Sequence, residues 1–172
     1  MNDFLDLAKK RFSVRKYSGK VVEQEKLDRI LEAGNVAPTA KNLQPQRIYV
    51  LRSEEALAKL DSLTHCRYGA GTALLFTYNT DEEWKNPLEE GIHSGVEDVS
   101  IVATHMMLEA KDLGLSTCWC NYFANSKLEE VFGLPSNEKS VLIMPVGYAV
   151  EDAKPAPMHD EHKDINEIVK NL

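Results

Sequence analysis

The stretch RFSVRKYS (residues 11–18) places three cations, Arg11, Arg15 and Lys16, around the hydroxyl of Ser13 in a chain whose net charge is −7. A guanidinium matches a phosphate bidentately, and a nearby hydroxyl supplies a further donor. Arg11 and Arg15 share a face if the preceding helix continues through them, whereas Ser13 can join them if that helix ends near residue 12. The stretch therefore indicates either an anion-binding site or a solvated helix end.

A second informative stretch is APTAKNLQPQRIYVL (residues 37–51), a loop that leads directly into a predicted strand. Asn42 and Gln44 lie in this loop between Pro38 and Pro45. Amide side chains both donate and accept hydrogen bonds, which suits the edge of a heteroaromatic ring. The alternative is a turn made rigid by proline, in which the amides serve the backbone.

Hydrophobic periodicity and turn residues predict helices and strands around these two stretches. Helices are expected over residues 2–10, 23–35, 53–63, 95–113 and 126–132, and strands over residues 46–52, 72–79, 116–123 and 140–150. Because two helices precede the first strand, we expect an α+β fold, and strands separated by helices suggest partly parallel connections. Pro145 suggests an edge position or a bulge for the last strand.

The predicted helix over residues 95–113, which Gly114 ends, is the longest in the chain, and its apolar residues cover more than one of its faces. A helix of this kind is expected to be central and buried. These residues are Val99, Val102, Ala103, Met106, Met107 and Ala110. The chain shows no repeat, low-complexity block or domain boundary, so we expect residues 1–172 to form a single domain.

Composition argues against several classes of function. The acidic net charge disfavours a nucleic-acid partner, and the apolar runs are too short to span a membrane. The opening residues do not resemble a signal peptide, so we expect a cytoplasmic location. Cys118 and Cys120 share a face of a predicted strand and read as buried thiols, because no second ligand pair lies at zinc spacing. We therefore expect no metal site.

Four stretches in the same order resemble the nitroreductase family of flavoproteins: residues 11–17, 37–51, 114–123 (GLSTCWCNYF) and 142–155 (LIMPVGYAVEDAKP). The resemblance extends over nearly the whole chain. It implies a homodimer that binds FMN, with a central mixed β-sheet flanked by helices and the long helix at the dimer interface. It also implies transfer of reducing equivalents from NADH or NADPH to small-molecule acceptors such as nitroaromatics or quinones. No side chain need act as a catalytic acid or base, because the cofactor performs the hydride steps.

The resemblance further implies which residues hold the flavin. Arg11 and Ser13 would contact the FMN phosphate and ribityl chain, and Arg15 the pyrimidine end, where a cation stabilises the charge of the reduced ring. The remaining expected contacts come from the partner's loop and from the backbone that faces the ring near atom N5. They are Pro38, Thr39, Ala40, Asn42 and Gln44 in the loop, and Cys120, Asn121 and Tyr122 near the ring.

The sequence departs from the family pattern at two places. An arginine often closes the phosphate site near the C-terminus, but the stretch DEHKD (residues 160–164) has His162 there, followed by Lys163. Either this pair binds phosphate, His162 fully only when protonated, or both lie in solvent. The short connection before residue 95 leaves little chain for lid helices, so we expect an open flavin face. The alternative function is a flavin-binding module or sensor without significant turnover.

Overall fold

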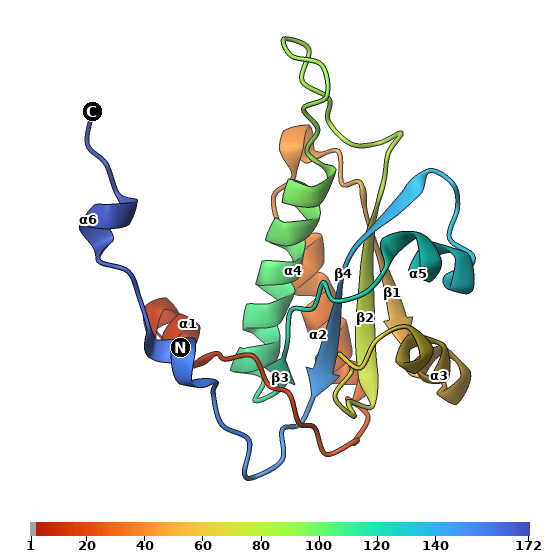
Figure 1. Cartoon of the computed structure of the whole chain (residues 1–172), viewed down its shortest axis with the longest axis vertical. Helices are drawn as coiled ribbons and strands as arrows, with labels where there is room; N and C mark the ends of the chain where they lie inside the picture. Colours follow the sequence, from red (N-terminus) through yellow and green to blue (C-terminus); the bar gives the residue numbers. More distant parts are fainter. Residues whose placement is uncertain (1–2) are drawn as a thin grey trace.

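The computed structural model describes residues 3–172, and a four-stranded sheet lies at its centre. The strands are β1 (Gln46–Leu51), β2 (Thr72–Asn79), β3 (Ser116–Thr117) and β4 (Glu138–Gly147), in the order β1-β2-β4-β3. The helices are α1 (Phe4–Lys10), α2 (Gln24–Asn35), α3 (Glu54–Leu63), α4 (Gly95–Asp112), α5 (Asn125–Phe132) and α6 (Ile165–Ile168), with short 3-10 turns η1 (Ala40–Asn42) and η2 (Pro157–Asp160). Figure 1 shows α2 and α4 on one face of the sheet and α3 and α5 on the other.

The sheet separates two apolar cores because successive side chains of a strand point to opposite faces. Leu74 and Phe76 of β2 pack with α2 and α4, whereas Ala73 and Leu75 pack on the side of α3 and α5. All four side chains are fully buried. The continuous apolar run of β2 is thus explained by a strand that is covered on both faces.

Local signals set the helix ends as the sequence predicts. The Ser53 hydroxyl accepts a hydrogen bond from the Ala56 N–H at 3.2 Å and caps α3. Gly133 has a φ of +63° and ends α5 in the left-handed conformation. The predicted first helix is α1, capped by Asp3; its predicted start at residue 2 lies outside the described residues.

The α+β class is confirmed, but the expectation of partly parallel connections is wrong for the paired strands. All three strand pairings are antiparallel, and Ser13 with Thr117 forms a parallel contact only as an isolated bridge. The reason is visible in the register: Leu51 at the end of β1 pairs with Ala73 at the start of β2. The helix α3 therefore does not carry the chain back along the sheet, as a parallel crossover requires.

Pro145 does not mark an edge strand, because β4 lies between β2 and β3. Thr117 pairs with Val146 and Cys120 with Ile143, so the register is continuous and Cys118 lies opposite Pro145. Proline offers no N–H at this position, and regular pairing is interrupted there. The predicted strand over residues 116–123 is consequently reduced to two residues and one isolated bridge.

The long helix α4 is central but is not buried all round. Val99, Val102, Ala103, Met106 and Ala110 are fully buried, and Met107 is half-buried. The opposite side of the helix exposes other apolar residues, including Val96 and Ile101, in this single chain. The connection over residues 80–94 contains no helix, as its shortness predicts. The C-terminal segment with α6 extends away from the body of the molecule, beyond α1 (Figure 1).

Candidate functional site

The segment that follows α1 is extended and lies against β3. The helix ends at Lys10, and Ser13 forms a bridge with Thr117, with the Val14 N–H donating to the Thr117 carbonyl at 3.0 Å. Val14 is buried, so its alternating neighbours Arg11, Ser13 and Arg15 lie on the other side of the segment. The structure therefore brings these three predicted side chains together, by strand alternation rather than by a helical turn.

These three residues line a hollow of about 190 Å³ together with part of the C-terminal segment. Arg15 donates only a long hydrogen bond of 3.4 Å to the Ser13 carbonyl. In the part of the chain that the structure describes, neither Arg11 nor Arg15 forms an ion pair, whereas the neighbouring Lys16 is paired with Asp152 at 2.8 Å. Two guanidinium groups without carboxylate partners thus flank one hydroxyl.

The C-terminal segment contributes histidines to this region. A second hollow of about 460 Å³ is lined by Arg11, His159, Asp160 and His162, among others, so His162 lies in the neighbourhood that the sequence predicts. Lys163 is exposed and lines neither hollow. Sequence reasoning missed His159, which lines both hollows and packs its ring against Phe12 at a centroid distance of 6.1 Å. No motif in the sequence singles it out.

The predicted loop is held by a buried carboxylate of α4. Asp98 is 2% exposed and accepts hydrogen bonds from the Ala40 N–H and the Ser94 hydroxyl, both at 2.7 Å. Lys41, Asn42 and Gln44 all have positive φ values between 51° and 56°, an uncommon conformation for residues with a Cβ. Loop geometry of this kind persists only where the surroundings hold it.

The amide groups of this loop are partly used within it. The Gln44 side-chain NH₂ donates to the Asn42 side-chain oxygen at 3.0 Å, and the Gln44 N–H donates to the Thr39 hydroxyl at 3.1 Å. Pro38, Asn42 and Gln44 are exposed, and Thr39 and Ala40 are half-buried. The alternative of a rigid turn therefore accounts for the hydrogen bonds within the loop. The exposed side of the loop, with Pro38, Asn42 and Gln44, is still accessible to a ligand.

Within one chain the structure does not bring this loop to the Arg11–Arg15 segment. Asp98, which holds the loop, is near the start of α4, whereas Thr117, which holds the segment, follows the end of that helix. The helix rises about 1.5 Å per residue, so Asp98 and Asp112 alone are separated by about 21 Å. The two groups lie at opposite ends of α4 (Figure 1).

The three predicted residues that follow β3, at positions 120–122, differ in how far they are exposed to solvent. Cys120 is buried and pairs with Ile143, and Asn121 is tied through its side-chain NH₂ to the Val141 carbonyl at 2.7 Å. Tyr122 is 74% exposed, with its ring 5.5 Å from that of His65. Asn121 and Tyr122 are therefore available at the surface, whereas the Cys120 side chain is buried and its N–H and carbonyl are both hydrogen-bonded to Ile143.

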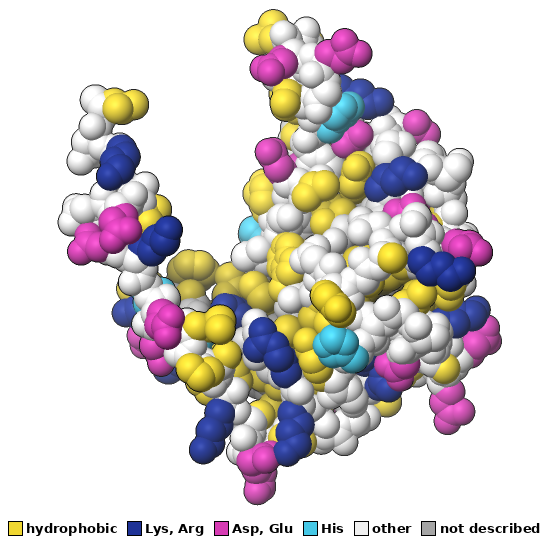
Figure 2. Space-filling model, viewed as in Figure 1, with side chains coloured by type: hydrophobic (Ala, Val, Ile, Leu, Met, Phe, Trp, Pro, Cys, Tyr) yellow, Lys and Arg dark blue, Asp and Glu magenta, His cyan; other side chains and the backbone are white. Residues whose placement is uncertain are grey.

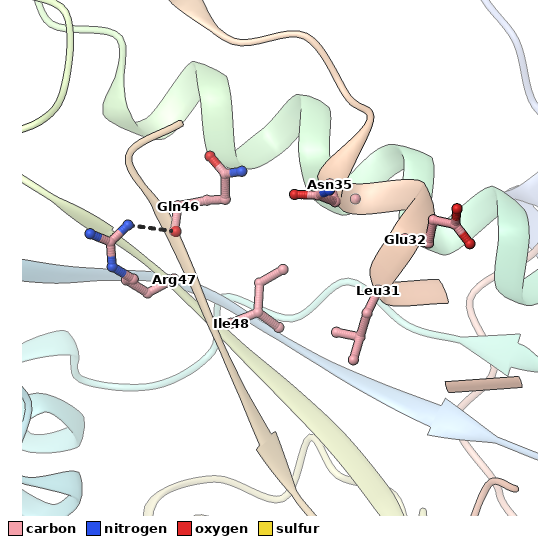
Figure 3. A pocket seen from close by; sticks show the side chains of 7 residues that line it. Leu31, Glu32, Asn35, Gln46, Arg47 and Ile48 are labelled. Carbon is pink, nitrogen blue, oxygen red and sulfur yellow. Dashed lines mark hydrogen bonds between the residues drawn. The ribbon is translucent and has the colours of Figure 1, made fainter. Parts of the chain in front are cut away.

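A further hollow of about 460 Å³ lies between α2 and β1 and contains none of the predicted site residues (Figure 3). The side chains of Leu31, Ile48 and Gln46 point into this region. The side-chain oxygen of Gln46 is buried without a hydrogen-bond partner, and the Arg47 guanidinium forms an ion pair with Glu82 at 2.6 Å.

Neither a metal site nor a membrane span is found among residues 3–172. No group of three metal-ligating side chains gathers there, and no helix of that range is long and apolar enough to cross a bilayer.

Comparison with known proteins places this architecture in a family. The family model described as "Nitroreductase family" matches residues 8–68 and 67–148, and the chain belongs to the nitroreductase family. Among solved structures, a nitroreductase family protein from Clostridium difficile 630 is 37% identical, with 99% of this chain and 98% of that chain covered and a TM-score of 0.91.

Two more distant relatives carry more specific descriptions. A curated "NADPH-dependent oxidoreductase" from Staphylococcus haemolyticus is 27% identical over 96% of this chain and 75% of its own length. A protein from Exiguobacterium sibiricum, whose structure contains FMN, has a TM-score of 0.83 at 22% identity, with 100% of this chain and 98% of that chain covered. At this identity, the second comparison supports the fold alone.

Proposed function

We propose that this protein is an FMN-dependent oxidoreductase that takes hydride from NADH or NADPH and reduces nitroaromatics, quinones or related small molecules. The observation that carries the proposal is the set formed by Arg11, Ser13 and Arg15, in which two guanidinium groups without ion pairs flank a hydroxyl beside a hollow. The family membership and the described activities of the relatives point to the same chemistry.

The residues present fit the phosphate end of FMN. The hollow of about 190 Å³ is lined by Arg11, Ser13 and Arg15, and it contains no carboxylate lining residue. The adjoining larger hollow includes Asp160, which would repel a phosphate dianion. We therefore assign the phosphate to the smaller hollow, which neither His162 nor Lys163 lines. His162 lies in the adjoining larger hollow, which shares Arg11 and His159 with the smaller one.

When bound, FMN would supply the hydride chemistry, accepting from the nicotinamide and donating to the acceptor. The protein's own residues bind and orient it. Arg11 and Ser13 would anchor the phosphate and ribityl chain, while Arg15 offers a positive charge toward the pyrimidine end of the ring. The exposed Tyr122 and, from a second copy of the chain, the loop over residues 37–45 would frame the ring from two directions.

The same arrangement supports a homodimer. The loop residues Pro38, Thr39, Ala40, Asn42 and Gln44 are too far from the Arg11 segment to share a flavin within one chain. A second copy can supply them if it packs against α4. The outer side of this helix offers an apolar surface, with a hollow of about 510 Å³ lined mainly by side chains of α1, α2 and α4. Exposed Val36 and Phe4 extend this surface. Each flavin would then lie at the interface between the two copies.

Two further expectations belong to this proposal. All three cysteines are free thiols, which is typical of a reducing compartment and supports a cytoplasmic location. The family model matches residues 8–68 and 67–148, which together cover all of residues 8–148 and support a single nitroreductase-like domain over residues 1–172.

The test is spectroscopic. The purified protein, with FMN added in excess and then removed from solution, should be yellow, and NADH or NADPH should bleach it in the absence of oxygen. A nitroaromatic or quinone should restore the colour. A yellow protein that neither nicotinamide reduces would favour the binding module without turnover. A protein that takes up no FMN would contradict both functions.

A further inference from the structure

Three aromatic rings, those of Tyr68, His65 and Tyr122, form a row at the surface. The Tyr122 ring lies 5.5 Å from that of His65, which in turn lies 5.9 Å from that of Tyr68. Tyr122 is 74% exposed, His65 is exposed and Tyr68 is half-buried. On the face shown in Figure 2, a histidine side chain lies among hydrophobic ones close to α3. Within residues 3–172, neither the Tyr122 hydroxyl nor the His65 imidazole has a hydrogen-bond partner, so this aromatic row offers apolar ring surface and two free polar groups.

The backbone beneath the aromatic row is held by contacts from two directions. The Thr64 hydroxyl donates to the Tyr122 carbonyl at 2.7 Å and accepts from the Cys66 N–H at 3.2 Å. The Tyr68 carbonyl accepts from the Tyr17 N–H at 3.2 Å. Tyr68 itself has a φ of +52°, a conformation that is uncommon for a residue with a Cβ and persists only where the surroundings hold it. The rings are therefore attached to a fixed framework and not to a free loop.

The turn that carries the aromatic row lies between two stretches that the proposed function gives to the flavin. One end of the turn is joined to the segment that contains Arg15, through the hydrogen bond between Tyr17 and Tyr68. The other end is joined to Tyr122, through its carbonyl. Because the rings adjoin both stretches, they border the proposed flavin site within one chain.

The charged groups next to the aromatic row are already paired. The Arg67 guanidinium, which belongs to the same turn, donates to both carboxylate oxygens of Asp61 and to the Ala70 carbonyl. The stretch over residues 119–126 contains no charged side chain. A ligand on these rings would therefore be recognised by stacking and by hydrogen bonds to neutral groups, and not by an ion pair with Arg67.

We propose that Tyr122 and His65 bind the acceptor, whose flat ring stacks on Tyr122 while one of its oxygens accepts a hydrogen bond from His65. This assignment rests on the proposed function and names the two side chains that select the acceptor. A phenol ring stacks in an offset arrangement on a planar ring, and an imidazole has at least one N–H to donate in either protonation state. Nitroaromatics and quinones combine a flat ring with an accepting oxygen, so the two side chains favour them over saturated molecules.

Binding without turnover tests the proposal. The protein is saturated with oxidised FMN, and no nicotinamide is present, so that no ligand is reduced. NMR titration then gives the dissociation constants of three neutral probes. Nitrobenzene has both the ring and the nitro group, nitrocyclohexane has the nitro group without the aromatic ring, and toluene has the ring without the nitro group. We expect nitrobenzene to bind most tightly, because it alone can make both contacts.

Variants assign the two contacts. Tyr122→Leu should weaken nitrobenzene binding by about 2- to 12-fold and leave nitrocyclohexane binding unchanged, whereas Tyr122→Phe keeps the ring and should bind nitrobenzene like the wild type. His65→Leu should weaken nitrobenzene binding by about 2- to 12-fold and leave toluene binding unchanged, whereas His65→Gln keeps a donor and should retain most of the affinity. Phe4→Leu removes a ring that is 67% exposed elsewhere on the surface and is the matched control.

Two results would overturn the proposal. One is a Tyr122→Leu effect that is equal for all three probes or no larger than that of Phe4→Leu. The other is a dimeric wild type whose Tyr122→Leu variant sediments as a monomer, which would place this ring between two copies of the chain. FMN uptake and bleaching by NADH or NADPH report the proposed function separately. A protein that bleaches, and whose affinity for nitrobenzene does not respond to Tyr122→Leu, keeps that function and refutes the acceptor site, whereas a protein that takes up no FMN refutes both.

Discussion

The side chain of Asp98 accepts a hydrogen bond of 2.7 Å from the backbone N–H of Ala40 and thereby ties the first turn of α4 to the loop over residues 37–45. The second carboxylate oxygen accepts from the Ser94 hydroxyl, which in turn accepts from the Trp84 N–H. One buried carboxylate therefore joins the loop, the helix and the start of the connection that precedes the helix.

Loss of this carboxylate should loosen the loop. Hydrogen bonds to a charged group contribute roughly 1.5–3 kcal/mol, and Asp98→Ala removes two. We expect the free energy of unfolding to fall by about 3–6 kcal/mol and amide exchange over residues 37–45 to accelerate. Asp98→Asn should cost less, because its amide can still accept from Ala40. The exposed neighbour Glu97→Ala is the control; an Asp98→Ala effect no larger than that of this control would show that the loop is held by other contacts.

The second prediction concerns FMN affinity. Arg11→Ala removes a charge-assisted contact with phosphate that is worth roughly 1.5–3 kcal/mol, so the dissociation constant should rise by about 10- to 150-fold while the fold is retained. Flavin fluorescence titration measures the constant, and circular dichroism checks the fold. Lys16→Ala removes a cation from the same segment, but one that Asp152 already pairs. If both variants bind like the wild type, Arg11 is a solvated surface residue.

The third prediction concerns His162, which lines the same hollow as Arg11. A protonated imidazole in this hollow, which adjoins the proposed phosphate site, adds a cation near the phosphate, so His162→Arg should bind FMN more tightly than the wild type at about pH 8.5 and similarly at about pH 6. The second ionisation of the phosphate acts on both proteins alike, so the difference between them reports the residue. Identical affinities over that range would place His162 away from the phosphate.

The fourth prediction concerns pH and stability. The Lys20 ammonium and the Tyr148 hydroxyl both donate to the Glu23 carboxylate at 2.6 Å, and these hydrogen bonds lower the Glu23 pKa from 4.5 to about 2. A lowered pKa contributes stability above the unfolded value and loses it as pH falls through the folded value.

Glu23→Gln should therefore lower the urea midpoint at pH 7, and this difference should shrink below about pH 4.5 and vanish near pH 2. The Glu23 side chain is 44% exposed to solvent, so the effect is expected to be small and to weaken in high salt. Glu25→Gln removes a carboxylate of the same helix turn that has no such partners and serves as control. A difference that persisted unchanged at pH 2 would mean that the glutamine acts through something other than charge.

Local chemistry made much of the fold predictable. The β2 strand falls on residues 72–79 as expected, and Ser53 and Gly133 cap the helices that the sequence assigns to them. Such features depend on neighbours within a few residues, so propensity and periodicity suffice. The grouping of Arg11, Ser13 and Arg15 was also open to prediction, because it depends on alternation along one short segment.

Other features depend on contacts that no local pattern encodes. The sequence alone indicated the elements, the cations and the family resemblance, but not the antiparallel course of the sheet, since a helix between two strands allows either direction. Only the tertiary structure placed Cys118 opposite Pro145 and His159 beside Arg11. It also placed the loop that contains Ala40 and the segment that contains Ser13 at opposite ends of α4, about 20 Å apart along the helix. These pairs are far apart along the chain, and their meeting is decided by how the sheet and α4 pack, because burying both faces of β2 admits few arrangements of the surrounding helices.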